Sequence, residues 1–292
     1  MNAKPLLVAT LCVLLCSAPL ARSQSLESWP IGGYMMQAVA KTMGAGADAS
    51  NRGYGFASGV SFLAGLCEVK EELRFTRSFT GGREYILIGA GDEDATDVDL
   101  SIHDADGRQI VADRLADSIP VVRFTPPRTG RYSLRLKLFS GKREAFCSVV
   151  ILERNAGFNV PLSNLAEASA RFFASCAAVN QTHVRLAFHN SPNEWAMFGQ
   201  VFRPGGKSTI NNLFPEPGDG FVVAVGDDNA NDLDLTLLTR DGSVVRRDHQ
   251  STLVPVVEYD YRTRINRSVQ TINHASDGNT FVLTAMMRAS NR

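Results

Sequence analysis

The chain has 292 residues, of which 44% are hydrophobic and 21% are charged, and its 30 basic residues equal its 30 acidic ones. This is the composition of a globular protein, and it excludes a disordered, fibrous or strongly basic nucleic-acid-binding chain. At about 100 to 200 residues per domain, the length accommodates two domains of ordinary size.

Residues 1–23 have the features of a secretory signal. Lys4 precedes an apolar run, and small residues follow up to Ser23. The run is too short to span a bilayer, which takes about 20 apolar residues. We therefore expect cleavage after Ser23, with Ala21 as the alternative, and an exported mature chain, periplasmic or extracellular, without a transmembrane segment. Loss of Lys4 and Arg22 leaves a net charge of about −2, which disfavours nucleic acid as a partner.

Two tandem halves are expected after the signal, residues 24–156 and 157–292, with a linker at Gly157–Pro161. The second half begins with a helix, because its apolar residues fall on one helical stripe: Leu162, Leu165, Phe172, Phe173, Cys176 and Val179. The segment Tyr54–Cys67 is interpreted as the counterpart of this helix in the first half, and a further short helix is expected at Tyr34–Met43.

An internal repeat is the strongest signal in the sequence. Residues 91–124 align without a gap onto residues 226–259, a constant shift of 135 positions. Twelve of these 34 positions are identical, and they include Gly91, Asp92, Ala95, Asp97, Asp99, Leu100, Asp106, Gly107, Asp113, Pro120, Val121 and Val122. Such self-similarity indicates a duplication.

Both copies have the pattern of β-structure. Val98, Leu100 and Ile102 alternate with polar residues, and so do the leucines of residues 233–237, which is typical of half-buried strands. Asp106-Gly107 and its counterpart at 241–242 predict tight hairpins. Further strands follow at similar spacing, so we predict a mainly β protein with two tandem jelly-roll-like β-sandwich domains, each preceded by a short helical segment.

The first copy resembles the bacterial pre-peptidase C-terminal (PPC) domain family. The residues that carry the resemblance are Phe79-Thr-Gly-Gly, Tyr85-Ile-Leu-Ile, Asp97-Val-Asp-Leu-Ser-Ile-His-Asp-Ala-Asp-Gly107 and Thr125-Pro-Pro-Arg-Thr-Gly-Arg-Tyr-Ser-Leu-Arg-Leu136. The resemblance covers about residues 73–154 and, more weakly, 196–288, where Tyr261–Arg267 replaces the Pro-Pro-Arg-Thr-Gly-Arg-Tyr segment. It implies jelly-roll-like sandwiches of the kind found beside secreted peptidases and in collagenase binding modules, some of which bind calcium. It implies no catalysis.

Clustered carboxylates are the candidate metal site. They are Asp92, Asp94, Asp97 and Asp99 in the first copy and Asp227, Asp228, Asp232 and Asp234 in the second. Oxygen-rich clusters suit Ca²⁺, which takes six to eight oxygen ligands, although neither run has the EF-hand spacing. The competing interpretation is a solvated polar strand face.

Three cysteines remain after cleavage of the signal, Cys67, Cys147 and Cys176. In an oxidising compartment a disulfide between Cys67 and Cys147 is one interpretation. Buried free thiols and a bridge between Cys67 and Cys176 are the others. No spacing of cysteine and histidine predicts a zinc site.

No nucleophile elbow, zinc-protease motif or phosphate-binding loop occurs, so no catalytic residue is assigned. Two sets of side chains are candidates for a face that binds a protein or polymer: Trp195, Phe198, Phe202 and Arg203, or Arg123, Arg131 and Arg135. The sequence therefore favours an exported, non-catalytic binding or envelope-associated protein, with calcium as the one candidate cofactor. The alternatives are a secreted hydrolase with an inter-domain site and a structural or assembly partner of a secreted peptidase. The oligomeric state is not predicted.

Overall fold

The structure is a computed structural model that describes residues 28–155, 158, 160–182, 184–189 and 193–291. These residues fall into two compact units. The N-terminal unit lies within residues 34–166 and 192–201, and the C-terminal unit within residues 28–33, 167–191 and 202–292. The predicted signal over residues 1–23 lies outside the described residues, as does part of the predicted linker.

The prediction of a mainly β fold is confirmed, because antiparallel strands make up most of both units. One predicted helix is wrong. The segment Tyr54–Cys67 forms strands β1 (Tyr54–Phe56) and β2 (Val60–Cys67). Strand β2 is an almost continuous run of buried apolar residues, a pattern that fits a buried strand as well as a buried helix.

The N-terminal unit contains two antiparallel sheets. One has the strand order β11-β2-β9-β4-β7, with β1 also paired to β9, and the other has the order β3-β8-β5-β6. The remaining strands of this unit are β3 (Glu72–Phe79), β4 (Tyr85–Gly91), β5 (Ala95–His103), β6 (Gln109–Asp113), β7 (Val121–Phe124), β8 (Gly130–Gly141), β9 (Ala145–Arg154) and β11 (Met197–Phe202, in this unit up to Val201). Phe79 of one sheet packs edge-on against Tyr85 and Phe124 of the other, at centroid distances of 4.9 and 5.4 Å.

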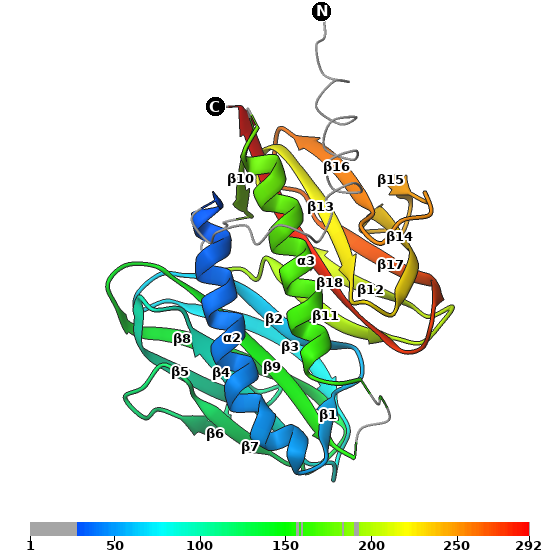
Figure 1. The fold of residues 1–292 in the computed structure, drawn as a ribbon. Helices are drawn as coiled ribbons and strands as arrows, with labels where there is room; N and C mark the ends of the chain where they lie inside the picture. Colours follow the sequence, from blue (N-terminus) through cyan, green and yellow to red (C-terminus); the bar gives the residue numbers. More distant parts are fainter. Residues whose placement is uncertain (1–27, 156–157, 159, 183, 190–192, 292) are drawn as a thin grey trace, which may run out of the picture. The chain divides into compact units, whose positions relative to one another are not determined.

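Helix α2 (Pro30–Asn51) belongs to the N-terminal unit from Tyr34 onward and crosses the face of the sheet that contains β4 and β9 (Figure 1). It begins at a proline, which has no N–H to leave unpaired in the first turn. Thr42 and Ser148 of β9 share a buried 2.6 Å hydrogen bond between their hydroxyls, which fixes the helix on the sheet. The short helix predicted at Tyr34–Met43 is therefore the middle of a longer one.

The C-terminal unit has the same plan. Its sheets run β16-β13-β18, with β10 paired to β18, and β12-β17-β14-β15. The strands are β10 (Val184–Phe188), β12 (Lys207–Leu213), β13 (Gly218–Gly226), β14 (Ala230–Thr239), β15 (Val244–Asp248), β16 (Val256–Tyr261), β17 (Arg267–Ser276) and β18 (Thr280–Asn291). Helix α3 (Ser163–Asn180), in this unit from Glu167 onward, buries the predicted apolar stripe from Leu165 to Val179. Trp29 contacts Phe172 and Phe188 at 5.8 and 5.4 Å.

The shift of 135 positions also relates most of the strand pairings of the two units, apart from a bulge in the pairing of β12 with β17. Glu72 lies opposite Lys137 in one unit, and Lys207 lies opposite Ile272 in the other. A Cβ on Gly91 would lie 2.2 Å from the Cβ of Ala95, and the corresponding distance between residues 226 and 230 is 2.3 Å. Close backbone approach therefore explains why glycine and alanine are identical in both copies.

None of the helices in the described part of the chain is long and apolar enough to cross a membrane.

Candidate functional site

The first aspartate of each acidic turn is buried and accepts hydrogen bonds from backbone N–H groups. Asp92 follows β4 and is 2% exposed. Its two carboxylate oxygens accept the backbone N–H groups of Asp94 at 2.9 Å and Phe146 at 2.7 Å. Its own N–H donates to the carbonyl of Phe146 at 3.0 Å. The side chain therefore ties the turn to the first residues of β9 rather than facing solvent.

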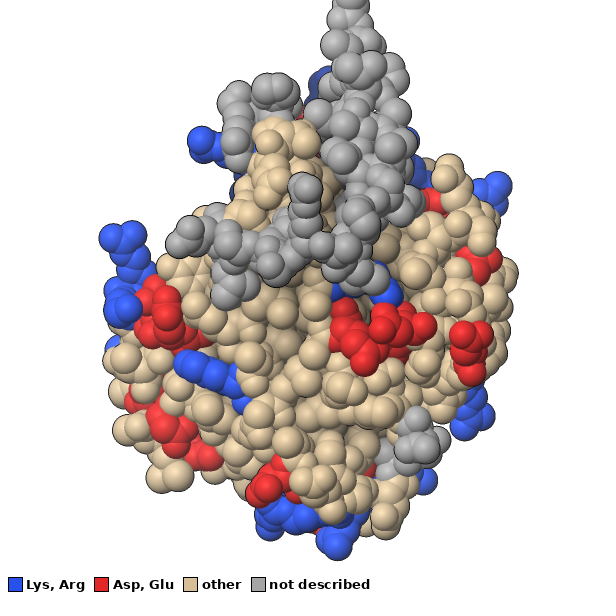
Figure 2. All heavy atoms as spheres, viewed as in Figure 1, with Lys and Arg blue, Asp and Glu red and all other residues tan. Residues whose placement is uncertain are grey.

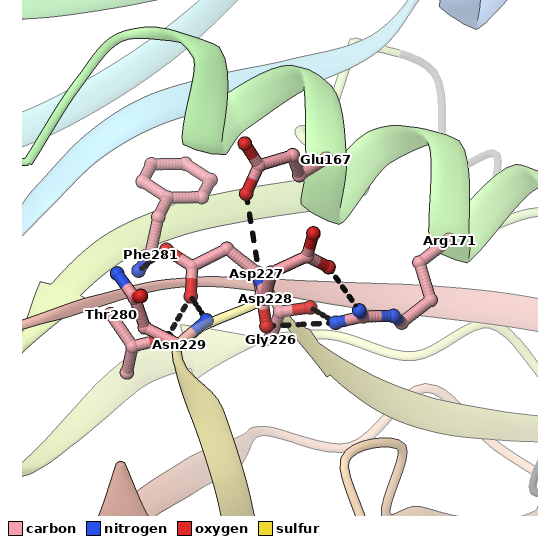
Figure 3. Close-up of polar contacts among 8 residues, drawn as sticks. All are labelled: Glu167, Arg171, Gly226, Asp227, Asp228, Asn229, Thr280 and Phe281. Atoms are coloured by element: carbon pink, nitrogen blue, oxygen red, sulfur yellow. Dashed lines mark hydrogen bonds and ion pairs between the residues drawn. The ribbon is translucent and has the colours of Figure 1, made fainter. Parts of the chain in front are cut away.

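Asp227 makes the same contacts in the second copy (Figure 3). It is fully buried, and its carboxylate accepts the N–H groups of Asn229 at 3.0 Å and Phe281 at 2.6 Å. It also accepts the hydroxyl of Thr280. Phe146 and Phe281 are themselves related by the shift of 135. Both copies thus use an aspartate of the predicted metal site to satisfy backbone donors.

A helix holds each turn from outside. In the N-terminal unit, Lys41 Nζ donates to the carbonyl oxygen of Asp92 at 2.8 Å, and Gln37 Oε1 accepts the N–H of Glu93 at 3.2 Å. These two side chains stand at i and i+4 of α2, so they project from the same face of the helix.

Helix α3 makes the equivalent contacts with the second acidic turn through Glu167 and Arg171 (Figure 3). Arg171 donates to the carbonyl oxygens of Gly226 and Asp227, the latter at 2.8 Å, and pairs with the carboxylate of Asp228 at 2.5 Å. Glu167 accepts the N–H of Asp228 at 3.5 Å. Sequence reasoning missed these helix residues. The signal was present, since residues 37–41 read Gln-Ala-Val-Ala-Lys and residues 167–171 read Glu-Ala-Ser-Ala-Arg.

The other predicted metal ligands do not take part in these hydrogen bonds between Asp92 or Asp227 and the backbone. Asp94 pairs with Lys142 at 2.7 Å, and Asp228 pairs with Arg171. Asp99 has a pKa raised by burial and then by the neighbouring charge of Asp97. Within the described residues, no group of three or more histidine, cysteine, aspartate or glutamate side chains is placed to hold a metal ion.

One observation keeps the calcium prediction open to experiment. Asp97 and Asp232, at equivalent positions, each have one buried carboxylate oxygen without a hydrogen-bond donor among the described residues. In the second copy the neighbouring Asp234 accepts a 2.7 Å hydrogen bond from His274, and His249 lies 3.9 Å from the same oxygen. Calcium therefore stays a prediction without an assembled ligand set.

The cysteines are buried. Cys67 lies on β2 and Cys147 on β9, which are paired strands, and Cys176 lies on α3. All three are free thiols in this structure, so the predicted bridge between Cys67 and Cys147 is not formed here. Burial raises the pKa of Cys67 to about 11 and raises the pKa of Cys147 as well. Neither thiol has the lowered pKa of a reactive cysteine.

The aromatic residues proposed for a binding face lie in the interior. Trp195, Phe198 and Phe202 are 3–5% exposed, and Phe198 packs against Phe75 at 6.4 Å. These side chains fill the core, so this alternative is wrong as a surface site. Arg203 is exposed.

The arginine alternative lies partly on an open sheet face. Along β8, Tyr132, Leu134, Leu136 and Leu138 are buried, while Arg131, Ser133, Arg135 and Lys137 alternate with them on the other side of the sheet. Arg123 lies on β7 of the other sheet and does not join them. We call the side of the β3-β8-β5-β6 sheet that carries Arg131, Arg135 and Lys137 the N-terminal outer face.

The strand register places side chains in rows across this face. Arg74 of β3 lies opposite Arg135, and Ser101 of β5 lies opposite Arg135 on its other side. The next row consists of Thr76, Ser133 and His103, and Ser78 lies opposite Arg131 beyond it. Arg74 and Arg135 therefore share one row, and Arg131 lies two rows away from them. On the other side of the Arg74–Arg135 row, Lys137 lies between the acidic residues Glu72 and Asp99.

Arg74 and Arg135 share one carboxylate. Glu72 contacts Arg74 directly and lies 3.7 Å from Arg135. The Nε of Arg135 is buried without an acceptor in the described part of the chain. Like charges directly opposite each other on neighbouring strands repel. Because Arg74 and Arg135 share the single carboxylate of Glu72, this pair of arginines keeps a net positive charge.

The same positions in the C-terminal unit carry no cation. Arg74, Arg131, Arg135 and Lys137 correspond to Thr209, Asn266, Gln270 and Ile272. Elsewhere, on the side of the molecule drawn in Figure 2, charged residues form small groups of both signs. The concentration of arginine on the N-terminal outer face thus distinguishes one copy from the other.

Comparisons with known proteins assign no family. No family model matches the chain, and no curated protein matches it. The periplasmic inhibitor of g-type lysozyme PliG from Aeromonas hydrophila is 14% identical over 33% of this chain and 91% of its own, with a TM-score of 0.25. The CBM22 tandem domain of Paenibacillus barcinonensis Xyn10C is 9% identical over 82% and 99%, with a TM-score of 0.22. A putative uncharacterized protein from Burkholderia cenocepacia is 12% identical over 98% and 94%, with a TM-score of 0.24. At these scores the likeness carries no argument about function.

Proposed function

We propose that this chain is an exported, non-catalytic binding protein built from two divergent PPC-like sandwiches, and that it binds an anionic polymer through the N-terminal outer face. The observation that carries the proposal is the row of Arg74, Arg135 and Ser101 across three strands. A guanidinium presents its donors in a planar fork that matches carboxylate, sulfate or phosphate groups. Side chains spaced along rigid strands suit a ligand that extends over several rows.

The polymer is expected to be an acidic polysaccharide. An exported protein meets such chains in the cell envelope, and the face offers hydroxyls from Ser101, Ser133 and Thr76 beside the arginines. Hydroxyls bind sugar hydroxyl groups, while the arginines bind the acidic substituents.

One contact on this face resembles part of a catalytic site. Ser101 Oγ lies 3.1 Å from His103 Nε2, and the other ring nitrogen lies 3.1 Å from the carbonyl oxygen of Gly107. Because a carbonyl only accepts, His103 Nδ1 carries the proton and Nε2 accepts the hydroxyl of Ser101. The pair is held by a carbonyl rather than a carboxylate and stands on an open sheet, so we assign it to ligand binding.

Affinity electrophoresis of residues 24–292 tests the proposal, with polygalacturonate as the acidic polymer and dextran as the neutral one. We expect retardation by polygalacturonate at low salt, and weaker retardation at about 150 mM salt because exposed charges are screened. The Arg74→Gln/Arg135→Gln variant should bind about tenfold or more weakly, since hydrogen bonds to charged groups contribute about 1.5–3 kcal/mol each.

The matched control is Thr209→Ala/Gln270→Ala, which changes the equivalent positions of the C-terminal unit. It should bind polygalacturonate as the wild type does. Equal retardation by dextran, or undiminished binding by the arginine variant, would refute the proposal. Steady turnover of 4-nitrophenyl acetate that is lost in Ser101→Ala would instead support a hydrolase with its site on this face, which differs from the inter-domain site of the hydrolase alternative.

A further inference from the structure

A pocket of about 520 Å³ lies at one end of the C-terminal unit. Two segments line it: Thr239 at the end of β14 with Arg240 and Asp241 of the following turn, and Ile265, Asn266 and Arg267 at the entry to β17. It is a shallow depression that is open to solvent, so it suits a small group at the end of a ligand rather than a whole enclosed ligand.

The pocket includes a segment in which the two copies differ. Residues 261–267 replace the Pro-Pro-Arg-Thr-Gly-Arg-Tyr segment of the first copy. Ile265 stands where the first copy has Gly130, and Arg267 stands where it has Tyr132. Tyr132 is buried and packs against Phe124 at 5.1 Å. The second copy has therefore exchanged a core aromatic residue for a cation at the pocket wall.

Arg267 is held in one orientation before any ligand binds. Its Nε donates to the hydroxyl of Tyr261 at 2.8 Å, and Nη1 donates to the carbonyl oxygen of Asn266 at 3.0 Å. The guanidinium carbon lies 4.6 Å from the centroid of the Tyr261 ring, and Tyr261 stacks on Tyr259 at 5.1 Å. A cation fixed in this way loses little conformational entropy when it binds an anion.

The charges of the lining favour an anion. Arg240 and Arg267 contribute two positive charges, and Asp241 contributes one negative charge. The oxygens of Asp241 accept the hydroxyls of Thr239 and Ser243 within their own turn, so this carboxylate is already engaged. Ile265 is 38% exposed and gives the pocket an apolar wall beside the arginines.

We propose that this pocket binds a carboxylate carried next to a small aliphatic group, as at the C-terminal residue of a peptide. Arg267 and Arg240 bind the carboxylate, since a guanidinium matches its two oxygens. Ile265 packs against the aliphatic group. The site lies in the other unit from the N-terminal outer face, so it does not depend on the function proposed above.

Isothermal titration of residues 24–292 with N-acetyl-L-leucine tests the proposal. We expect a dissociation constant on the order of millimolar, because the ligand is small. N-acetyl-L-leucinamide, which lacks the carboxylate, should bind at least about tenfold more weakly, and D-glucuronate, which lacks the aliphatic group, should also bind more weakly.

Arg240→Gln and Arg267→Gln should each weaken binding of N-acetyl-L-leucine about tenfold or more, the loss expected for a charge-assisted hydrogen bond. Arg240 is exposed, so its variant keeps the test valid if Arg267→Gln unfolds the unit. Arg52→Gln, at an exposed arginine of the other unit outside both proposed sites, should bind as the wild type does. No binding at 20 mM ligand, roughly ten times the expected constant, equal binding of the amide or of glucuronate, or unchanged binding by both pocket variants would overturn the proposal.

Discussion

Asp92 and Asp227 occupy equivalent positions, and each uses both carboxylate oxygens to accept backbone N–H groups from its own turn and from a phenylalanine of the last long strand. Their contacts with Lys41 and Arg171 add a helix to the same arrangement. The repeated unit is therefore larger than the 34 aligned residues and includes a helix, an acidic turn and a closing strand.

Asp227→Asn should lower the free energy of unfolding of the C-terminal unit by about 1–3 kcal/mol, because an amide has one acceptor oxygen and leaves a buried N–H unpaired. Asp228→Asn is the control, since Asp228 is 70% exposed and its ion pair contributes about 0.2–1 kcal/mol. Urea denaturation in a Trp195→Phe background measures this unit alone, because Trp29 is then the single tryptophan. Equal losses in both variants would contradict the role of Asp227 as an acceptor of backbone hydrogen bonds.

Gly226→Ala should destabilise the C-terminal unit by about 1–3 kcal/mol, the usual cost of overpacking. The new Cβ would lie 2.3 Å from the Cβ of Ala230. Gly226→Ala/Ala230→Gly removes this clash and should recover part of the loss in the same urea experiment. A double variant less stable than the sum of the single variants would show that the contact is not the cause.

His189 should make the C-terminal unit less stable in acid. Burial lowers the pKa of His189 to about 4 from 6.5, and its Nδ1 accepts the N–H of Glu216 at 3.1 Å. Below pH 6.5 the unfolded chain binds a proton that the folded chain does not. The stability that depends on neutral His189 is therefore fully present only above pH 6.5. It is lost as pH falls toward 4, by about 3 kcal/mol at most. The slope of stability against pH over this interval should be smaller in His189→Gln, and an unchanged slope would contradict the assignment.

The cysteines should react only after unfolding. Thiolate is the reactive form, and burial raises the pKa of Cys67 to about 11. Without reductant, Ellman's reagent should detect three thiols per mature chain in 6 M guanidinium chloride and almost none in the native protein at pH 8. A count of one thiol in guanidinium would instead support the disulfide that the sequence suggested.

Calcium is tested by thermal melting of residues 24–292 in EDTA and after addition of Ca²⁺ or Mg²⁺. The calcium prediction expects a melting temperature that rises with Ca²⁺ and rises less in Asp97→Asn/Asp232→Asn, since an ion that binds only the folded state stabilises it. These residues hold the two buried oxygens without donors. A melting temperature unaffected by Ca²⁺ would contradict the calcium prediction and leave Asp92 and Asp227 as buried acceptors of backbone hydrogen bonds.

The β-strands of the repeat were predictable because alternation and turn chemistry agree. The hairpins at Gly107 and Gly242 have φ values of +81° and +88°, the conformation that their glycines predicted. The prediction failed at Val60–Cys67, where nearly every side chain is buried and no period of two is visible. Tertiary packing, rather than local preference, makes this segment a strand.

The candidate site was less predictable than the fold. Sequence reasoning grouped the aspartates by their spacing, but the structure directs Asp92 and Asp227 at backbone groups that lie 54 residues away along the chain. No local pattern contains that information. Arg131 and Arg135 were identified from the sequence, whereas Arg74 joins them only through the pairing of β3 with β8.

The Gly91–Ala95 contact and its counterpart at residues 226 and 230 restrict which substitutions the two copies can accumulate after the duplication. A larger residue at the glycine meets a methyl group, so a change at this position has to be preceded by a change at its neighbour. Positions that must change in pairs diverge slowly in evolution. Outward positions such as those of Arg135 and Gln270 can change by single substitutions. The common origin of the two halves can therefore still be recognised from their buried positions, whereas their exposed strand positions have diverged.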